Sequence, residues 1–193
     1  LNKANKFLLK IDDRKLLFSN ICELLSQTDK IQFSFIYDLL SKEIIAQEGD
    51  LKQKLLTQSH YYSDKNKDNI ISKTIKWETN IIANDFLEKN ISIFYDKAKV
   101  LDIKSMACFP IKKFNKVIGT LAIYSKELNF FDQEVEILFD KLISDVTHCL
   151  EKIDYEQIRL KQEDELRLSS YAFESSEPMI ITNDEGNIIK VNQ

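Results

Sequence analysis

The feature that most constrains the fold is a long segment with helical periodicity in the last third of the chain. From residue 132 to about residue 169, apolar side chains recur at steps of three, four and seven, which places them along one face of an α-helix. Two apolar runs, 105–113 and 116–126, precede this segment, with a tight turn at Asn115 between them. Such a pair predicts two antiparallel strands. The chain therefore combines a sheet with a helix that continues past its own domain.

The apolar seam of this helix is heptad-like for about three and a half repeats. Beyond Ile153 the segment is too polar to be buried in its own domain, and an isolated helix of this kind is marginally stable in water. We therefore predict a homodimer in which the terminal helices pair in parallel as a coiled coil. The expected interface residues are Leu138, Leu142, Val146, Cys149, Ile153 and Leu160.

Shorter periodic segments fill the first half of the chain. Residues 2–28 have helical spacing, as one bent helix or as two helices, the second capped by Asp12-Asp13 and beginning near Arg14. The later strands are apolar on both faces, so they must be covered on both sides. This predicts an α+β fold with a central antiparallel sheet and helices on both faces. The other expected elements are strands at 31–40, 43–47 and 80–84 and short helices at 70–76 and 93–103.

Composition excludes several classes of protein. The net charge of −4, from 27 basic and 31 acidic residues, argues against a nucleic-acid partner, which favours a basic surface. The cysteines, Cys22, Cys108 and Cys149, are odd in number and widely spaced, which predicts reduced thiols and no zinc site. No apolar run approaches the roughly 20 residues needed to span a bilayer, and no signal peptide is visible. We therefore expect a cytoplasmic location, no membrane contact by this segment and no bound metal.

The order of motifs in the second half resembles a GAF domain. Residues 105–111 (SMACFPI) form a strand that begins with serine and ends in proline and an aliphatic residue. A glycine-containing strand, 117–124 (VIGTLAIY), and the acidic opening of a helix, 131–134 (FDQE), follow. Upstream, 79–85 (TNIIAND) looks like the strand ending in Asn-Asp of many family members. The resemblance implies a GAF-like sensory domain over residues 1–153.

The last segment resembles a second family. Residues 172–192 (AFESSEPMIITNDEGNIIKVN) look like the opening of a PAS domain, with a helical cap, a strand, a turn at Gly186 and a second strand. Glycine supplies the positive φ that such a turn requires. The resemblance implies a connecting signalling helix at 154–171 and an incomplete PAS domain at 172–193. Because the chain begins at Leu1 and ends in mid-pattern at Gln193, we expect it to be a piece of a longer protein.

A GAF domain followed by a helix and a PAS domain resembles the sensory half of bacterial signalling proteins. This implies control of a diguanylate cyclase output, which makes cyclic di-GMP; the sensor region of a histidine kinase is the alternative. The family's ligand pocket lies between the sheet and the short helices, and aromatic rings there suit a planar ligand. The matching positions are Phe35, Tyr37, Trp77, Asp85, Tyr95, Met106, Cys108 and Tyr124.

These residues also fit a filled core, so a dimerisation module without a ligand is the second interpretation. The ligand class and any cofactor stay unknown at this stage. Methionine sulfoxide reductases of the GAF type use clustered cysteines, whereas Cys22, Cys108 and Cys149 do not cluster in the sequence. His60 and His148 lie in surroundings that suit ordinary surface or core histidines. With no nucleophile–base pair evident, the sequence predicts that this segment is not an enzyme.

Overall fold

The computed structural model describes residues 13–49, 69–86, 99, 101–174 and 180–191. The chain divides into two compact units, 1–151 and 152–193. Within the described part, no helix is both long enough and apolar enough to cross a membrane.

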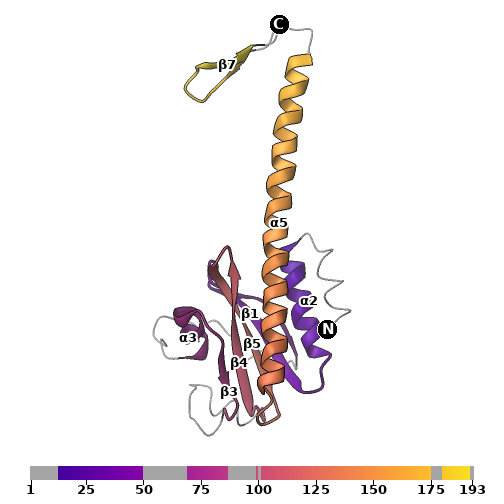
Figure 1. Ribbon diagram of the computed structural model, residues 1–193, viewed down its shortest axis with the longest axis vertical. Helices are drawn as coiled ribbons and strands as arrows, with labels where there is room; N and C mark the ends of the chain where they lie inside the picture. The colour runs from indigo at the N-terminus through magenta and orange to yellow at the C-terminus, as the bar shows by residue number, and fades with distance from the viewer. Residues whose placement is uncertain (1–12, 50–68, 87–98, 100, 175–179, 192–193) are drawn as a thin grey trace. The chain divides into compact units, whose positions relative to one another are not determined.

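The first unit is built around a five-stranded antiparallel sheet in the order β2-β1-β5-β4-β3 (Figure 1). The tight turn between the two central strands is confirmed, since Phe114 and Asn115 both have positive φ, as hairpin turns of this kind require. The predicted α+β class and the predicted strands are confirmed. The strands are β1 (Ile31–Asp38), β2 (Glu43–Gly49), β3 (Ile81–Ala83), β4 (Ser105–Lys113) and β5 (Lys116–Ser125).

The helices cover both faces of the sheet, as predicted. Helix α2 (Arg14–Ser26) begins after Asp13, whose carboxylate accepts a hydrogen bond from the Lys15 amide at 2.7 Å, and it contacts β1 and β2. The first part of α5 (Gln133–Glu174) lies on the same face, where the rings of Phe139 and Phe109 are 5.3 Å apart. Helix α3 (Ile70–Trp77) covers the opposite face and contacts β3, β4 and β5 (Figure 1).

Four of the six predicted dimer-interface residues are buried within the single chain. Leu142, Val146, Cys149 and Ile153 are at most 6% exposed, whereas Leu138 and Leu160 are 45% and 53% exposed. Periodicity identifies a buried face of a helix without identifying what buries it. For Leu142, Val146 and Cys149, the interior of the first unit supplies that cover. The interface assigned to these residues therefore needs correction, and the pairing of two chains stays a prediction.

The second unit contains the rest of α5 and a small hairpin. Arg159 bridges Glu156 at 2.8 Å and Glu163 at 3.0 Å, spacings of three and four residues that support an exposed helix. Strands β6 (Ile180–Thr182) and β7 (Ile188–Val191) pair antiparallel around Gly186, whose φ is +84°. This confirms the predicted strand–turn–strand pattern. The helix ends at Glu174 and not near residue 169.

The predicted helix at 93–103 falls mostly outside the described residues. Lys99 is helical, and residues 101–102 form a turn before β4.

Candidate functional site

The candidate site is the layer between the sheet and α3. Phe33, Phe35 and Tyr37 alternate along β1 and so point to one face of the sheet. Pairing between strands continues this face: Phe33 lies opposite Tyr124, and Tyr124 lies opposite Met106. In the next row, Phe35 lies opposite Ala122, which lies opposite Cys108. The buried cluster of this layer also contains Ile70, Ile71, Ala83, Phe86 and Ile103.

Four aromatic rings of this layer contact one another. The Phe35 and Tyr124 rings are stacked with centroids 6.1 Å apart, and Phe33 lies 5.8 Å from Phe35. Phe86, in the turn after β3, meets Tyr124 edge-on at 6.5 Å. Both the stacked and the edge-on geometry are favourable for aromatic rings. Together the four rings, each at most 5% exposed, form the aromatic centre of the layer.

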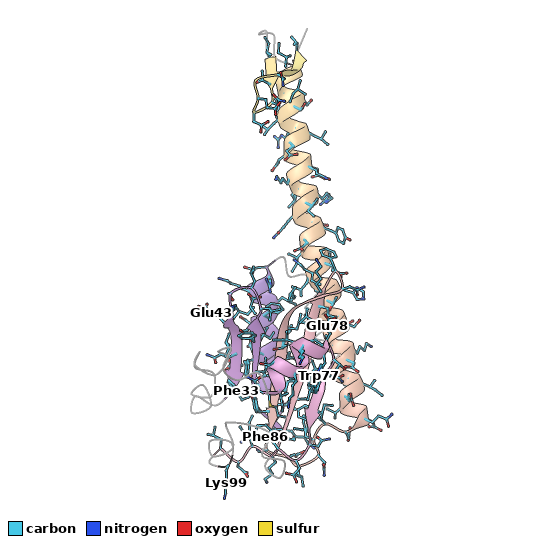
Figure 2. All side chains as sticks on the ribbon, turned by 90° about the vertical axis from the view of Figure 1, so that its left-hand side faces the viewer. Phe33, Glu43, Trp77, Glu78, Phe86 and Lys99 are labelled. Carbon is cyan, nitrogen blue, oxygen red and sulfur yellow. The ribbon has the colours of Figure 1, made fainter. Side chains whose placement is uncertain are left out.

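The structure brings five of the eight predicted ligand residues into this one buried cluster. They are Phe35, Tyr37, Met106, Cys108 and Tyr124. Trp77 does not join them, because it ends α3 with its side chain 58% exposed (Figure 2). Asp85 is half-buried in the turn after β3, and Tyr95 lies outside the described residues.

Sequence reasoning did not assign two of the rings at the centre of this layer to the site. Phe33 shares the two-residue alternation of Phe35 and Tyr37, so its place was available from the pattern. Phe86 follows β3 in an irregular turn, where no periodicity identifies the direction of a side chain.

The side chains of Thr74, Cys108 and Thr120 are buried beside the rings. Thr74 of α3 donates a hydrogen bond from Oγ1 to the Cys108 carbonyl at 3.5 Å. Within the described residues, the Thr120 hydroxyl has no hydrogen-bond partner of normal geometry. Burial raises the pKa of the Cys108 thiol to about 12, although the nearby Thr74 and Thr120 hydroxyls act in the opposite direction. Burial likewise raises the pKa of Tyr124, so both groups are neutral at physiological pH.

The other two cysteines are also buried and free. Cys22 of α2 lies on the opposite face of the sheet, beside Ser34, and burial raises the pKa of its thiol to about 12. A thiol reacts as a nucleophile only in its thiolate form, so a raised pKa suppresses the reaction.

We expect the native protein to resist thiol modification. In Ellman's reagent at pH 8, the three thiols should react only after denaturant is added, because each is buried in the folded state. The absorbance of the released thionitrobenzoate measures the number of thiols that have reacted. Rapid labelling of even one thiol in the native protein would contradict the described burial.

A second polar cluster lies where β1 ends. The Asp38 carboxylate pairs with the Arg14 guanidinium of α2 and accepts hydrogen bonds from the Ser41 amide and hydroxyl, both at 2.9 Å. Burial alone would raise the pKa of Asp38, but the Ser41 hydrogen bonds and the Arg14 charge outweigh it and lower that pKa. The cluster fixes the start of α2 to the end of β1. Sequence reasoning missed it, because partners 24 residues apart leave no local pattern.

This cluster predicts pH-dependent stability. Above the unfolded-state pKa of about 3.9, the ionised Asp38 stabilises the fold, and the contribution disappears as pH falls through the lower folded-state pKa. Replacing Asp38 with asparagine should therefore cost about 1–3 kcal/mol at pH 7 and progressively less near pH 3. Urea unfolding at both pH values measures this. Asp29→Asn, at an exposed position, is the control; an equal loss in both variants would refute the assignment.

The chain was compared with protein families, curated proteins and solved structures. No protein-family model matches the chain, and no curated protein matches it. Among solved structures, the chain resembles free methionine-R-sulfoxide reductase of Staphylococcus aureus in complex with substrate, at 21% identity and TM-score 0.60, over 79% of this chain and 91% of that one. The Neisseria meningitidis reductase, also with its substrate, has 13% identity and TM-score 0.63 over 81% and 88%.

A third similar structure is a GAF domain from a larger protein. The GAF domain of an Acinetobacter phosphoenolpyruvate-protein phosphotransferase has 13% identity and TM-score 0.58, over 81% of this chain and 92% of that one. The chain has a GAF-like fold. At these identities the likeness shows the fold alone.

The comparison corrects one expectation from the sequence. The prediction that this segment is not an enzyme is contradicted, because reductases are among the structures that share its fold. Both reductases and GAF domains of other proteins share this fold, so the fold provides no ground for excluding an enzyme.

Proposed function

We propose that this chain is a sensory region of a bacterial signalling protein. In this proposal, the region binds a small, uncharged, planar molecule between its sheet and α3. One observation carries the proposal: five of the predicted ligand residues converge in the buried layer facing α3, together with Phe33 and Phe86. Aromatic faces and edges with a few placed polar groups are typical of small-molecule sites.

The described residues also favour a particular ligand class. Stacked and edge-on rings suit a flat molecule, and the Thr120 hydroxyl supplies a hydrogen-bonding group without a partner of normal geometry. Cys108 and Tyr124 are neutral in this layer. A charged ligand would lose its hydration without gaining an opposite charge from these residues, so a neutral ligand fits best.

The organisation of the chain supports a role in signalling. The division after residue 151 lies close to the predicted end of the sensory domain at 153, and α5 continues through 154–171. The β6–β7 hairpin is compatible with a PAS domain starting near 172. By the resemblance of this arrangement, we propose a diguanylate cyclase as the output domain, with a histidine kinase as the alternative.

We further propose that the chain works as a homodimer through its terminal helices. On the part of α5 in the second unit, Leu160, Leu166 and Leu168 are each more than half exposed. Apolar side chains in such number on one helix favour association with a second helix, because pairing removes them from water.

Native mass spectrometry under gentle conditions tests the proposal, with Thr120→Val and Ser19→Ala as variants. A dimer with a discrete extra mass, retained in the control Ser19→Ala at an exposed position of α2 and lost or reduced in Thr120→Val, would support a sensor. The same preparation, denatured and analysed by mass spectrometry, would identify the ligand. A dimer without added mass, even after incubation with cell extract, would instead favour a ligand-free dimerisation module. A monomer at micromolar concentration would contradict pairing of the helices.

A further inference from the structure

A second site lies outside the α3-facing layer, in a groove of about 410 Å³ along the edge of β4. Strand β3 is only three residues long and pairs with β4 from Met106 to Cys108. From Phe109 onward, β4 has no β3 neighbour, so a space remains between this edge and the first part of α5. A groove of this volume falls within the range of small-molecule sites.

Helix α5 presents a regular polar stripe to this groove. Asp140, Ser144, Thr147 and Glu151 all line it, and their spacing of four, three and four residues places them on one face of the helix. At about 1.5 Å per residue, the last three lie roughly 6, 10 and 16 Å along the axis from Asp140. The stripe thus has a carboxylate at each end and two hydroxyls between them.

The opposite wall is apolar at its base. Phe109 and Pro110 of β4 form this wall, and Ile143 of α5 adds apolar surface beside them. Proline lacks the amide hydrogen that an open strand edge would otherwise expose. Methylene groups of a ligand can rest on such a surface while its polar atoms face α5.

The charges near the groove determine the sign of the ligand. Among the described residues that line the groove, Lys112 is the one lysine or arginine, and it pairs with Glu78 at 3.4 Å. His148 also lines the groove. Glu136 lies beside Asp140, and burial followed by this neighbouring charge raises the pKa of Asp140. Glu151 accepts a hydrogen bond from the Phe114 amide at 3.1 Å, which leaves its negative charge in place. The groove therefore has an excess of negative charge.

We propose that this groove binds a linear polyamine. The two terminal ammonium groups would lie against Asp140 and Glu151, and the inner amines would donate hydrogen bonds to Ser144 and Thr147. When extended, the aminopropyl–aminobutyl–aminopropyl chain of spermine is about as long as the roughly 16 Å of helix axis between Asp140 and Glu151, so its two ends can reach both carboxylates. Its methylene groups would cover Pro110 and Ile143.

Isothermal titration calorimetry with spermine tests the proposal on the full chain. We expect binding at one site per chain, with putrescine, which is too short to reach both carboxylates, at least tenfold weaker. Asp140→Asn and Glu151→Gln should each weaken spermine binding about fivefold, because each removes one partly exposed charge pair. Glu134→Gln removes the same charge from an exposed position of α5 outside the groove and should leave the affinity within twofold.

Three results would overturn the proposal. The first is no binding of spermine at millimolar concentration, the second is binding of putrescine as tight as that of spermine, and the third is a loss of affinity in Glu134→Gln as large as that in Asp140→Asn. Either of the last two results would show that the polyamine is attracted by the net negative charge of the protein and does not use the polar stripe on α5. Melting temperatures of the variants without spermine check that each is folded.

Discussion

Replacing Phe109 with alanine should lower the free energy of unfolding of the first unit by about 3–5 kcal/mol. The Phe109 side chain is 1% exposed, and its ring lies 5.3 Å from that of Phe139 at the start of α5. Phe139 in turn contacts Phe131 at 6.0 Å. Removing the ring leaves a cavity where β4 meets α5, and the backbone of a sheet cannot collapse to fill it.

Urea denaturation followed by circular dichroism measures this loss. Phe114→Ala is the matched control, because it removes the same ring at a site that is 48% exposed; it should change stability by no more than about 0.5 kcal/mol. Similar losses in the two variants would mean that Phe109 does not connect the sheet to α5 as described.

The sheet was predictable from sequence because its strands carry strong local signals. In β1, aromatic and β-branched residues alternate from Ile31 to Tyr37, and the β4–β5 pair is joined by a turn at Asn115. The arrangement of helices on both faces followed from a physical requirement, since a strand apolar on both sides must be covered on both sides.

The site was only partly predictable, because periodicity shows which face of a helix or strand is apolar but does not show which element packs against that face. Trp77 follows the helical pattern of α3, yet it is the last residue of that helix, and its side chain extends into solvent. Val146 and Cys149 follow the seam of α5, and the first unit itself buries them. Asp38 and Arg14 are paired only by the tertiary fold, so no spacing along the chain could identify them.

Replacing Gly119 with alanine should destabilise the first unit by about 2–4 kcal/mol, because overpacking is costly and a backbone hydrogen bond would also be weakened. A Cβ atom at this position would lie 2.4 Å from the carbonyl oxygen of Tyr37 and 3.6 Å from the Cα of Asp38. The obstructing atoms belong to the backbone of β1, so no side-chain rotation can relieve the clash. Strands β1 and β5 would have to separate where Leu39 donates to the Ile118 carbonyl at 2.9 Å.

Gly186→Ala is a second glycine replacement, at a position where the new side chain meets no obstruction. Nothing lies within 4 Å of a Cβ at Gly186, although its φ of +84° is unfavourable for alanine, at about 1–2 kcal/mol. Because Gly186 belongs to the second unit, that cost should leave unfolding of the first unit unchanged. Hydrogen exchange gives a local readout: in Gly119→Ala the Leu39 amide should exchange faster than in the parent chain. Unchanged exchange together with unchanged stability would show that β1 and β5 do not approach as closely at Gly119 as the structure describes.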